Sequence, residues 1–217
     1  MSNTWKFIIG ILAIVVLIVV VYFVTRTPDD TSAVPSPVDT QTQTSQTANN
    51  TVPSKPMNYT EATFTTNMGS FTIAFDPQLA PNTVANFEKL ASSGFYNKVK
   101  FHRIIAGFMI QGGDPLSKDD SQQSAWGTGG PGYQFADEIT PDSKNVIGAV
   151  AMANSGPNTN GSQFFINVAN NDYLDGHYSV FAHVTSGYDI VSKISQVKTG
   201  PNDRPVEPVV IESISLK

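Results

Sequence analysis

The pattern of apolar and polar residues divides this chain of 217 residues into stretches of different character. Residues 7–24 carry no charge, and only Gly10 and Tyr22 interrupt a strongly apolar run. The run of 18 residues just reaches the length at which a helix spans a bilayer. No small-x-small cleavage motif follows it, which favours an anchor over a cleaved signal peptide. We therefore predict a transmembrane anchor at 7–24, after a short tail at 1–6.

Residues 25–58 are rich in Thr, Gln, Ser, Pro and Asn and offer almost no side chain for a hydrophobic core. This composition predicts a disordered linker. Lys6 and the amino terminus precede the apolar run and Arg26 follows it, a weak charge bias that favours a cytoplasmic N-terminus. We therefore expect a single-pass membrane protein whose folded part, residues 59–217, lies outside the cytoplasm.

Beyond residue 58 the apolar residues follow patterns that are typical of strands. Alternating segments on either side of a turn at 67–69 predict a β-hairpin. Further short apolar runs stand between Gly-rich turns, at 101–110, 146–152, 163–168, 179–184 and 209–216. Many strands and few helices favour a mainly β domain built as a closed antiparallel barrel.

Two segments show helical spacing instead. Pro81 stands where a first helical turn tolerates proline, and Gly94 stands where a C-terminal cap is expected. Between them the apolar residues recur on one helical face, so the pattern predicts a helix over 81–93. A second helix is predicted over 188–195, with its apolar residues turned inward.

Composition narrows the classes of function. The charges before residue 59 cancel, so the net charge of −5 belongs to the domain and argues against nucleic acid as the main partner. The chain has no cysteine, which excludes disulfides and thiolate metal sites. His102, His177 and His183 lack the spacing of metal ligands, so no metal or other cofactor is expected. Residues 127–132 formally match G-x-G-x-x-G, but they contain a proline and open no helix, so we interpret them as a loop.

Three blocks of sequence carry a family resemblance. Residues 101–114 read FHRIIAGFMIQGGD, residues 152–165 read MANSGPNTNGSQFF, and residues 173–181 read YLDGHYSVF. In this order they resemble the marked segments of the cyclophilins, a family of peptidyl-prolyl cis/trans isomerases, and the resemblance covers essentially all of 59–217. It implies a closed eight-stranded antiparallel β-barrel capped by two α-helices, with an active groove on its outer face.

The implied reaction is rotation about an Xaa-Pro amide bond, which amide resonance opposes with a barrier of about 18 to 20 kcal/mol. Halfway through rotation the lone pair is localised on nitrogen, so a fixed donor aimed there stabilises the twisted state and not the planar one. Arg103 is the only lysine or arginine in the first two blocks. We therefore predict that Arg103 supplies this donor. Outside the matched segment the same residue would be interpreted as a solvated strand arginine.

The resemblance assigns the remaining site residues. Phe108, Met109, Phe165 and Leu174 are expected to form an apolar cup for the proline ring, while Gln111 and the backbone of Asn154 hold the flanking peptide groups. His102 is expected either to support Arg103 or to make a structural hydrogen bond. The predicted catalytic residues are Arg103, Gln111 and His102, and the predicted substrate-binding residues are Phe108, Met109, Ala153, Asn154, Gln163, Phe165, Tyr173, Leu174 and Tyr178.

These residues predict an isomerase that acts on Xaa-Pro bonds of unfolded or exported chains, with a domain that is monomeric. The alternative is a proline-peptide-binding module or holdase in which catalysis is incidental. Retention of Arg103 favours the enzyme, because a pure binder has no need of an arginine at that point.

Three positions depart from the family pattern. Ala106 stands where proline is usual, Tyr173 where many members have tryptophan, and Tyr178 where many have histidine. Such aromatic exchanges are frequent in bacterial members, so we expect a bacterial-type, membrane-anchored cyclophilin. The exchanges bear on ligand preference more than on the chemistry.

Overall fold

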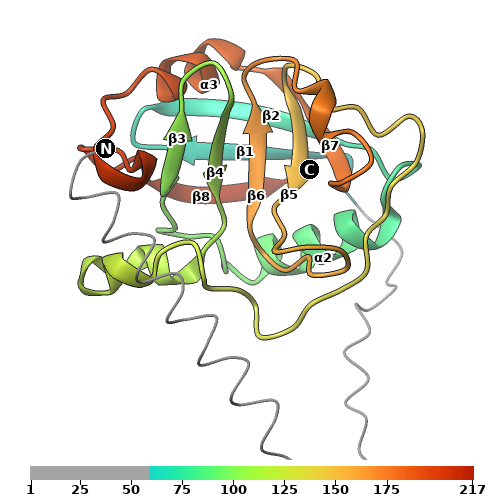
Figure 1. Cartoon of the computed structure of the whole chain (residues 1–217), viewed down its shortest axis with the longest axis horizontal. Helices are drawn as coiled ribbons and strands as arrows, with labels where there is room; N and C mark the ends of the chain where they lie inside the picture. Colours follow the sequence, from blue (N-terminus) through green and yellow to red (C-terminus); the bar gives the residue numbers. More distant parts are fainter. Residues whose placement is uncertain (1–58) are drawn as a thin grey trace, which may run out of the picture. The chain divides into compact units, whose positions relative to one another are not determined.

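The computed structural model describes residues 59–217, which form one antiparallel sheet and two α-helices (Figure 1). The tail, anchor and linker predicted at 1–6, 7–24 and 25–58 lie outside the described residues. Within residues 59–217 no helix is both long and apolar enough to cross a membrane.

The prediction of a mainly β domain is confirmed. The strands are β1 (Glu61–Thr66), β2 (Gly69–Phe75), β3 (Arg103–Ile105), β4 (Met109–Gly112), β5 (Ala149–Met152), β6 (Phe164–Asn167), β7 (Val180–Ser186) and β8 (Ile211–Leu216). They pair in the order β3-β4-β6-β5-β7-β2-β1-β8, and every pair is antiparallel. Figure 1 shows how far the sheet curls: β3, β4, β6 and β5 run in front of β2, β1 and β8, which cross behind them.

The sheet is a half-barrel, so the prediction of a closed barrel is wrong. β3 and β8 stand at the two ends of the strand order and share no ladder. Before these strands begin, Lys100 bridges to Val210 as an isolated pair. β3 is only three residues long, because the chain turns back at Gly107 with φ of +70°. In the antiparallel register of this bridge, β3 would face residues 205–207, which lie in the loop between η4 and β8.

Both predicted helices are present. α2 (Pro81–Ser92) begins at the predicted proline and ends one residue early, with Ser93 as its C-cap, and α3 (Tyr188–Ser195) has the predicted bounds. They lie at opposite ends of the half-barrel (Figure 1). Phe87 of α2 is fully buried at the centre of an aromatic cluster. Its ring centroid lies 5.0 Å from Tyr96, 5.3 Å from Phe181, 5.8 Å from Phe164 and 6.0 Å from Phe64.

Side-chain alternation along β4 and β6 creates two separate apolar clusters. Ile110 and Ile166 belong to the inner core, whereas their neighbours Met109 and Phe165 belong to a second cluster. Successive residues of a strand point to opposite faces of the sheet. The second cluster therefore lies on the other face of the sheet and forms a floor outside the core.

Four short 3-10 helices were not predicted from the sequence: η1 (Pro115–Lys118), η2 (Asp120–Ala125), η3 (Asp172–Leu174) and η4 (Pro201–Asp203). η1 and η2 occupy the polar stretch after Asp114, whose side chain caps η1 by accepting from Leu116 N at 2.8 Å. η3 carries Tyr173 and Leu174 to the sheet. η4 packs beside β3, at the open end of the sheet.

Candidate active site

Strand register sets the predicted catalytic residues in one row. Arg103 of β3 lies opposite Gln111 of β4, and Gln111 in turn lies opposite Phe165 of β6. Residues directly opposite each other in adjacent strands project from the same face of a sheet. The row therefore carries a cation, an amide and an aromatic ring side by side on the face outside the core.

A small pocket of about 220 Å³ opens over this row. Its lining consists of Arg103, Phe108, Met109, Gln111, Ala153, Asn154, Phe165, Leu174 and Tyr178. The ring of Tyr178 meets that of Phe165 edge to face at 5.3 Å. The structure thus brings nine of the twelve predicted site residues together, and leaves His102, Gln163 and Tyr173 outside this lining.

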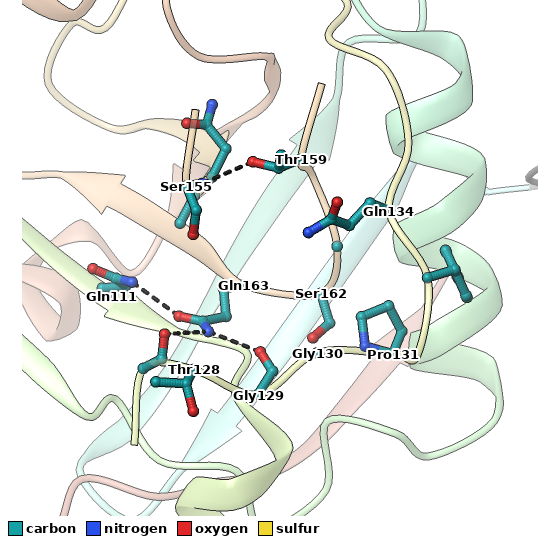
Figure 2. A pocket seen from close by; sticks show the side chains of 15 residues that line it. Gln111, Thr128, Gly129, Gly130, Pro131, Gln134, Ser155, Thr159, Ser162 and Gln163 are labelled. Atoms are coloured by element: carbon teal, nitrogen blue, oxygen red, sulfur yellow. Dashed lines mark hydrogen bonds between the residues drawn. The ribbon is translucent and has the colours of Figure 1, made fainter. Parts of the chain in front are cut away.

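A chain of hydrogen bonds connects the row to the loop before Tyr133 (Figure 2). Gln163 Nε2 donates to the carbonyl oxygens of Gly127 and Gly129 at 3.0 and 2.9 Å. Gln111 Nε2 donates to Gln163 Oε1 at 3.0 Å, and Arg103 Nη1 donates to Gln111 Oε1 at 3.4 Å. Because a backbone carbonyl can only accept, the loop dictates which way each amide points. Gln111 therefore presents its oxygen to Arg103.

A second pocket of about 300 Å³ adjoins the first and shares Gln111, Ala153 and Asn154 with it. Figure 2 shows its walls: the glycine-rich loop runs along one side, and Ser155 and Thr159 stand on the other. Its remaining lining includes Gly127, Thr128, Gly129, Gly130, Pro131, Gln134, Ser162 and Gln163. Sequence reasoning missed this pocket. The glycine-rich run at 127–132 was the available signal, and we interpreted it only as a loop.

Glycine is required at one position of that loop. A Cβ atom on Gly129 would lie 2.1 Å from Asp114 Oδ1, far inside van der Waals contact. Asp114 is fully buried and also accepts a hydrogen bond from Gly127 N. The Asp114 carboxylate therefore positions the loop so that the carbonyl groups of Gly127 and Gly129 accept hydrogen bonds from Gln163.

His102 is placed differently from the rest of the predicted set. Its side chain is buried, 4% exposed, and neither ring nitrogen makes a hydrogen bond of good geometry among the described residues. Burial lowers the pKa of His102 to about 4; Asp114 and the backbone of Lys100 oppose this shift, and the charges of Arg103 and Arg204 add to it. A neutral, buried imidazole adds no charge to the pocket.

This burial predicts an acid-dependent loss of stability. The pKa of His102 is about 4 in the folded protein, below its ordinary value of 6.5, so the unfolded chain binds the proton more tightly. The contribution of His102 to the free energy of unfolding is therefore fully present above pH 6.5 and is lost as the pH falls toward 4. Urea unfolding should show that the free energy of unfolding of the wild-type protein is lower at pH 4.5 than at pH 7. We expect this decrease to be smaller by about 2 to 3 kcal/mol in His102→Gln. Equal decreases in the two proteins would contradict this assignment.

Tyr173 lies at the rim rather than in the pocket. It is 69% exposed on η3, and its ring stacks on that of Phe108 with centroids 6.1 Å apart. Asn154 is fixed by two hydrogen bonds, because its Nδ2 donates to His177 O at 3.1 Å and its Oδ1 accepts from Gly156 N at 3.2 Å. The described residues contain no group of three or more His, Asp and Glu that could hold a metal ion.

The half-barrel thus carries an apolar pocket with one arginine in its lining. Residues 62–216 match the family model for cyclophilin type peptidyl-prolyl cis-trans isomerases and CLD proteins. Over 153 residues the chain is 46% identical to peptidyl-prolyl cis-trans isomerase-like 1 of Aspergillus fumigatus, which covers 70% of this chain and 92% of that protein. The human isomerase-like 1 protein is 45% identical over 147 residues, 67% of this chain and 86% of that protein.

Comparison with solved structures indicates the same family. A crystal structure of a Cryptosporidium parvum cyclophilin type peptidyl-prolyl cis-trans isomerase aligns with a TM-score of 0.67 at 32% identity, over 73% of this chain and 98% of that one. The same protein was also crystallised in the presence of the dipeptide Ala-Pro. The chain therefore belongs to the cyclophilin family, and it is a peptidyl-prolyl cis/trans isomerase.

These comparisons correct the predicted localisation. The expectation of a single-pass membrane protein with its domain outside the cytoplasm is wrong, because the relatives are isomerase-like 1 proteins of eukaryotes. The expected bacterial character is not supported either, since the relatives are fungal and mammalian. The comparisons do not test the suggestion of exported clients, which stays a prediction.

Proposed function

We propose that this isomerase seats the proline ring of an Xaa-Pro bond in the pocket over Met109 and Phe165, and that Arg103 donates a hydrogen bond to the amide nitrogen as the bond twists. The observation that supports this is the row Arg103, Gln111, Phe165, which sets a single guanidinium beside an apolar floor. Met109 and Phe165 are 2% and 5% exposed, so their packing fixes the shape of that floor.

Arg103 supplies only part of the acceleration. A hydrogen bond from a charged donor contributes about 1.5 to 3 kcal/mol net, which corresponds to about one to two decades in rate. The remainder comes from holding one side of the amide while the other turns, and from removing water around it. We expect the apolar lining of the pocket to provide this hold, and Gln111 and Asn154, which also line it, to hold the flanking peptide groups.

The second pocket extends the same groove along the substrate. It shares three lining residues with the proline pocket, and its walls are mostly backbone and short polar side chains. We propose that it receives a neighbouring substrate side chain of varied size, so the enzyme acts on Xaa-Pro bonds in unfolded segments with little sequence preference. Uncatalysed isomerisation of such bonds takes about tens to hundreds of seconds, slow enough to delay folding.

A protease-coupled assay on short Xaa-Pro peptides tests this function with the full chain. We expect the full chain to raise the isomerisation rate in proportion to its concentration. The alternative function, a proline-peptide-binding module or holdase, predicts peptide binding by calorimetry without a matching change in rate. Retention of Arg103 in the pocket lining favours catalysis.

Tyr173 is expected to reduce sensitivity to cyclosporin-like ligands. In tryptophan-bearing members such ligands accept a hydrogen bond from the indole N–H, and a phenol cannot place a donor at the same point. Because Tyr173 is 69% exposed, Tyr173→Trp should be accommodated without disturbing the core. We expect the substitution to tighten the ligand by about 1 kcal/mol, the scale of one net hydrogen bond. Competition titrations of both proteins measure this, and unchanged affinity would refute it.

A further inference from the structure

Arg103 has an ionic partner that the family resemblance did not assign. Asp203 Oδ2 of η4 lies 3.4 Å from Arg103 Nε, although the two residues are 100 positions apart. Both side chains are roughly half-exposed, at 42% for Arg103 and 47% for Asp203. An exposed pair of this kind adds little to stability. Its position beside the pocket indicates a different role.

The backbone that presents Asp203 is strained. Asn202 and Asp203 have φ of +60° and +57°, and both belong to the small set of described residues other than glycine with positive φ. Asn and Asp tolerate this left-handed region better than other residues with a side chain, but they usually occur in it singly, so two in succession keep a mild strain that the surrounding structure must impose. Strain of this kind clusters at functional sites.

The loop around η4 imposes that conformation from both sides. Gly200 N donates to Arg204 O at 2.7 Å, and Thr199 forms an isolated bridge with Pro205. The guanidinium of Arg204 lies 5.6 Å from the centre of the Trp126 ring, which ties the loop to the segment before Gly127. The loop that carries Asp203 is therefore closed by its own contacts, which fix the position of the carboxylate.

Arg103 is consequently anchored at two separate atoms. Asp203 accepts from its Nε, and Gln111 accepts from its Nη1 at 3.4 Å. Two anchors define the plane of the guanidinium, while Nη2 takes part in neither contact. An arginine side chain loses much conformational entropy when it is ordered. If it is ordered before the substrate binds, less of this entropy cost remains to be met in the transition state.

We propose that Asp203 is a positioning residue that orients Arg103 toward the twisted amide; this inference rests on the catalytic role proposed above for Arg103. Asp203 acts through Arg103 and does not line the pocket. Its removal should therefore lower kcat more than it changes the affinity for a peptide. An exposed pair predicts a loss of about two- to fivefold in kcat/KM.

Glycine substitutions separate positioning from loop stability. Asp203→Gly removes the carboxylate but relieves the positive φ, so we expect an unchanged or higher melting temperature together with lower kcat/KM. Asn202→Gly relieves the positive φ of the preceding residue and keeps the Asp203 carboxylate, so it should leave kcat/KM unchanged. Asp203→Glu should recover part of the activity that Asp203→Asn loses, because it restores the charge.

The Arg103→Ala background provides the decisive comparison. There, adding Asp203→Gly should produce no further loss, because the residue through which Asp203 acts is absent. A further loss in that background, or wild-type kcat/KM in Asp203→Gly alone, would overturn the positioning role while leaving the role of Arg103 intact. Near-normal activity of Arg103→Ala itself would overturn the catalytic proposal first, and the positioning role with it.

Discussion

Arg103→Ala is expected to lower kcat/KM by at least about one to two decades, the value of one charge-assisted hydrogen bond made in the transition state. Because this bond strengthens only as the amide twists, the loss should appear in turnover and hardly in peptide affinity. The melting temperature should change little, since Arg103 is 42% exposed and its pair with Asp203 lies at the surface.

Two measurements check this result. A protease-coupled assay gives kcat/KM, and calorimetry with an Ala-Pro peptide gives the affinity. Arg103→Lys serves as the matched control: it keeps the charge but loses the planar fork of donors, so it should recover only part of the activity. Near-normal catalysis by a folded Arg103→Ala protein would refute the assigned role and favour the holdase interpretation.

Phe87→Ala is expected to cause the largest loss of stability among single substitutions in α2, about 3 to 5 kcal/mol. The ring is fully buried and lies within 6.0 Å of five other aromatic rings from five parts of the chain. The cavity left behind cannot collapse easily, because these neighbours are held by β1, β2, β6, β7 and the segment after α2. The melting temperature should fall by about 10 °C.

Phe108→Ala is the matched control for Phe87→Ala. The same atoms are removed, but Phe108 is only partly buried and lines the proline pocket. We expect it to weaken peptide binding and turnover together while shifting the melting temperature by less than half as much. Phe87→Ala should retain kcat/KM at a temperature where it remains folded. If the two substitutions affected stability equally, Phe108 would belong to the core and not to the groove.

Much of the local structure was predictable from the sequence because local patterns determine it. The bounds of α3 follow from the helical spacing of its apolar residues, and the β1–β2 hairpin from alternation around its turn. The prediction of α2 differed by a single residue, at the end where helices fray. The closed barrel was wrong because closure requires β3 and β8 to pair, and the residues that would face β3 lie in the loop before β8. The run at 101–110 also concealed a turn at Gly107.

The candidate site was predictable in its membership but not in its geometry. The family resemblance named nine residues that line one pocket, which periodicity alone would have assigned to an ordinary strand face. The placement of His102 was not accessible, because burial of a polar residue depends on what packs over it. The second pocket had only a partial signal, the glycine-rich run at 127–132, because its walls come from segments about 30 residues apart in the chain.

By itself, the sequence of residues 59–217 determined most of the strands, the two helices and nine residues that line the pocket over Met109 and Phe165. Tertiary structure alone decided the register that aligns Arg103 with Gln111 and Phe165, and the loop that brings Asp203 to Arg103. The physical reason is sequence separation. Local patterns report which face of an element is apolar, whereas contacts between residues 100 positions apart exist only after the sheet has curled and its loops have closed.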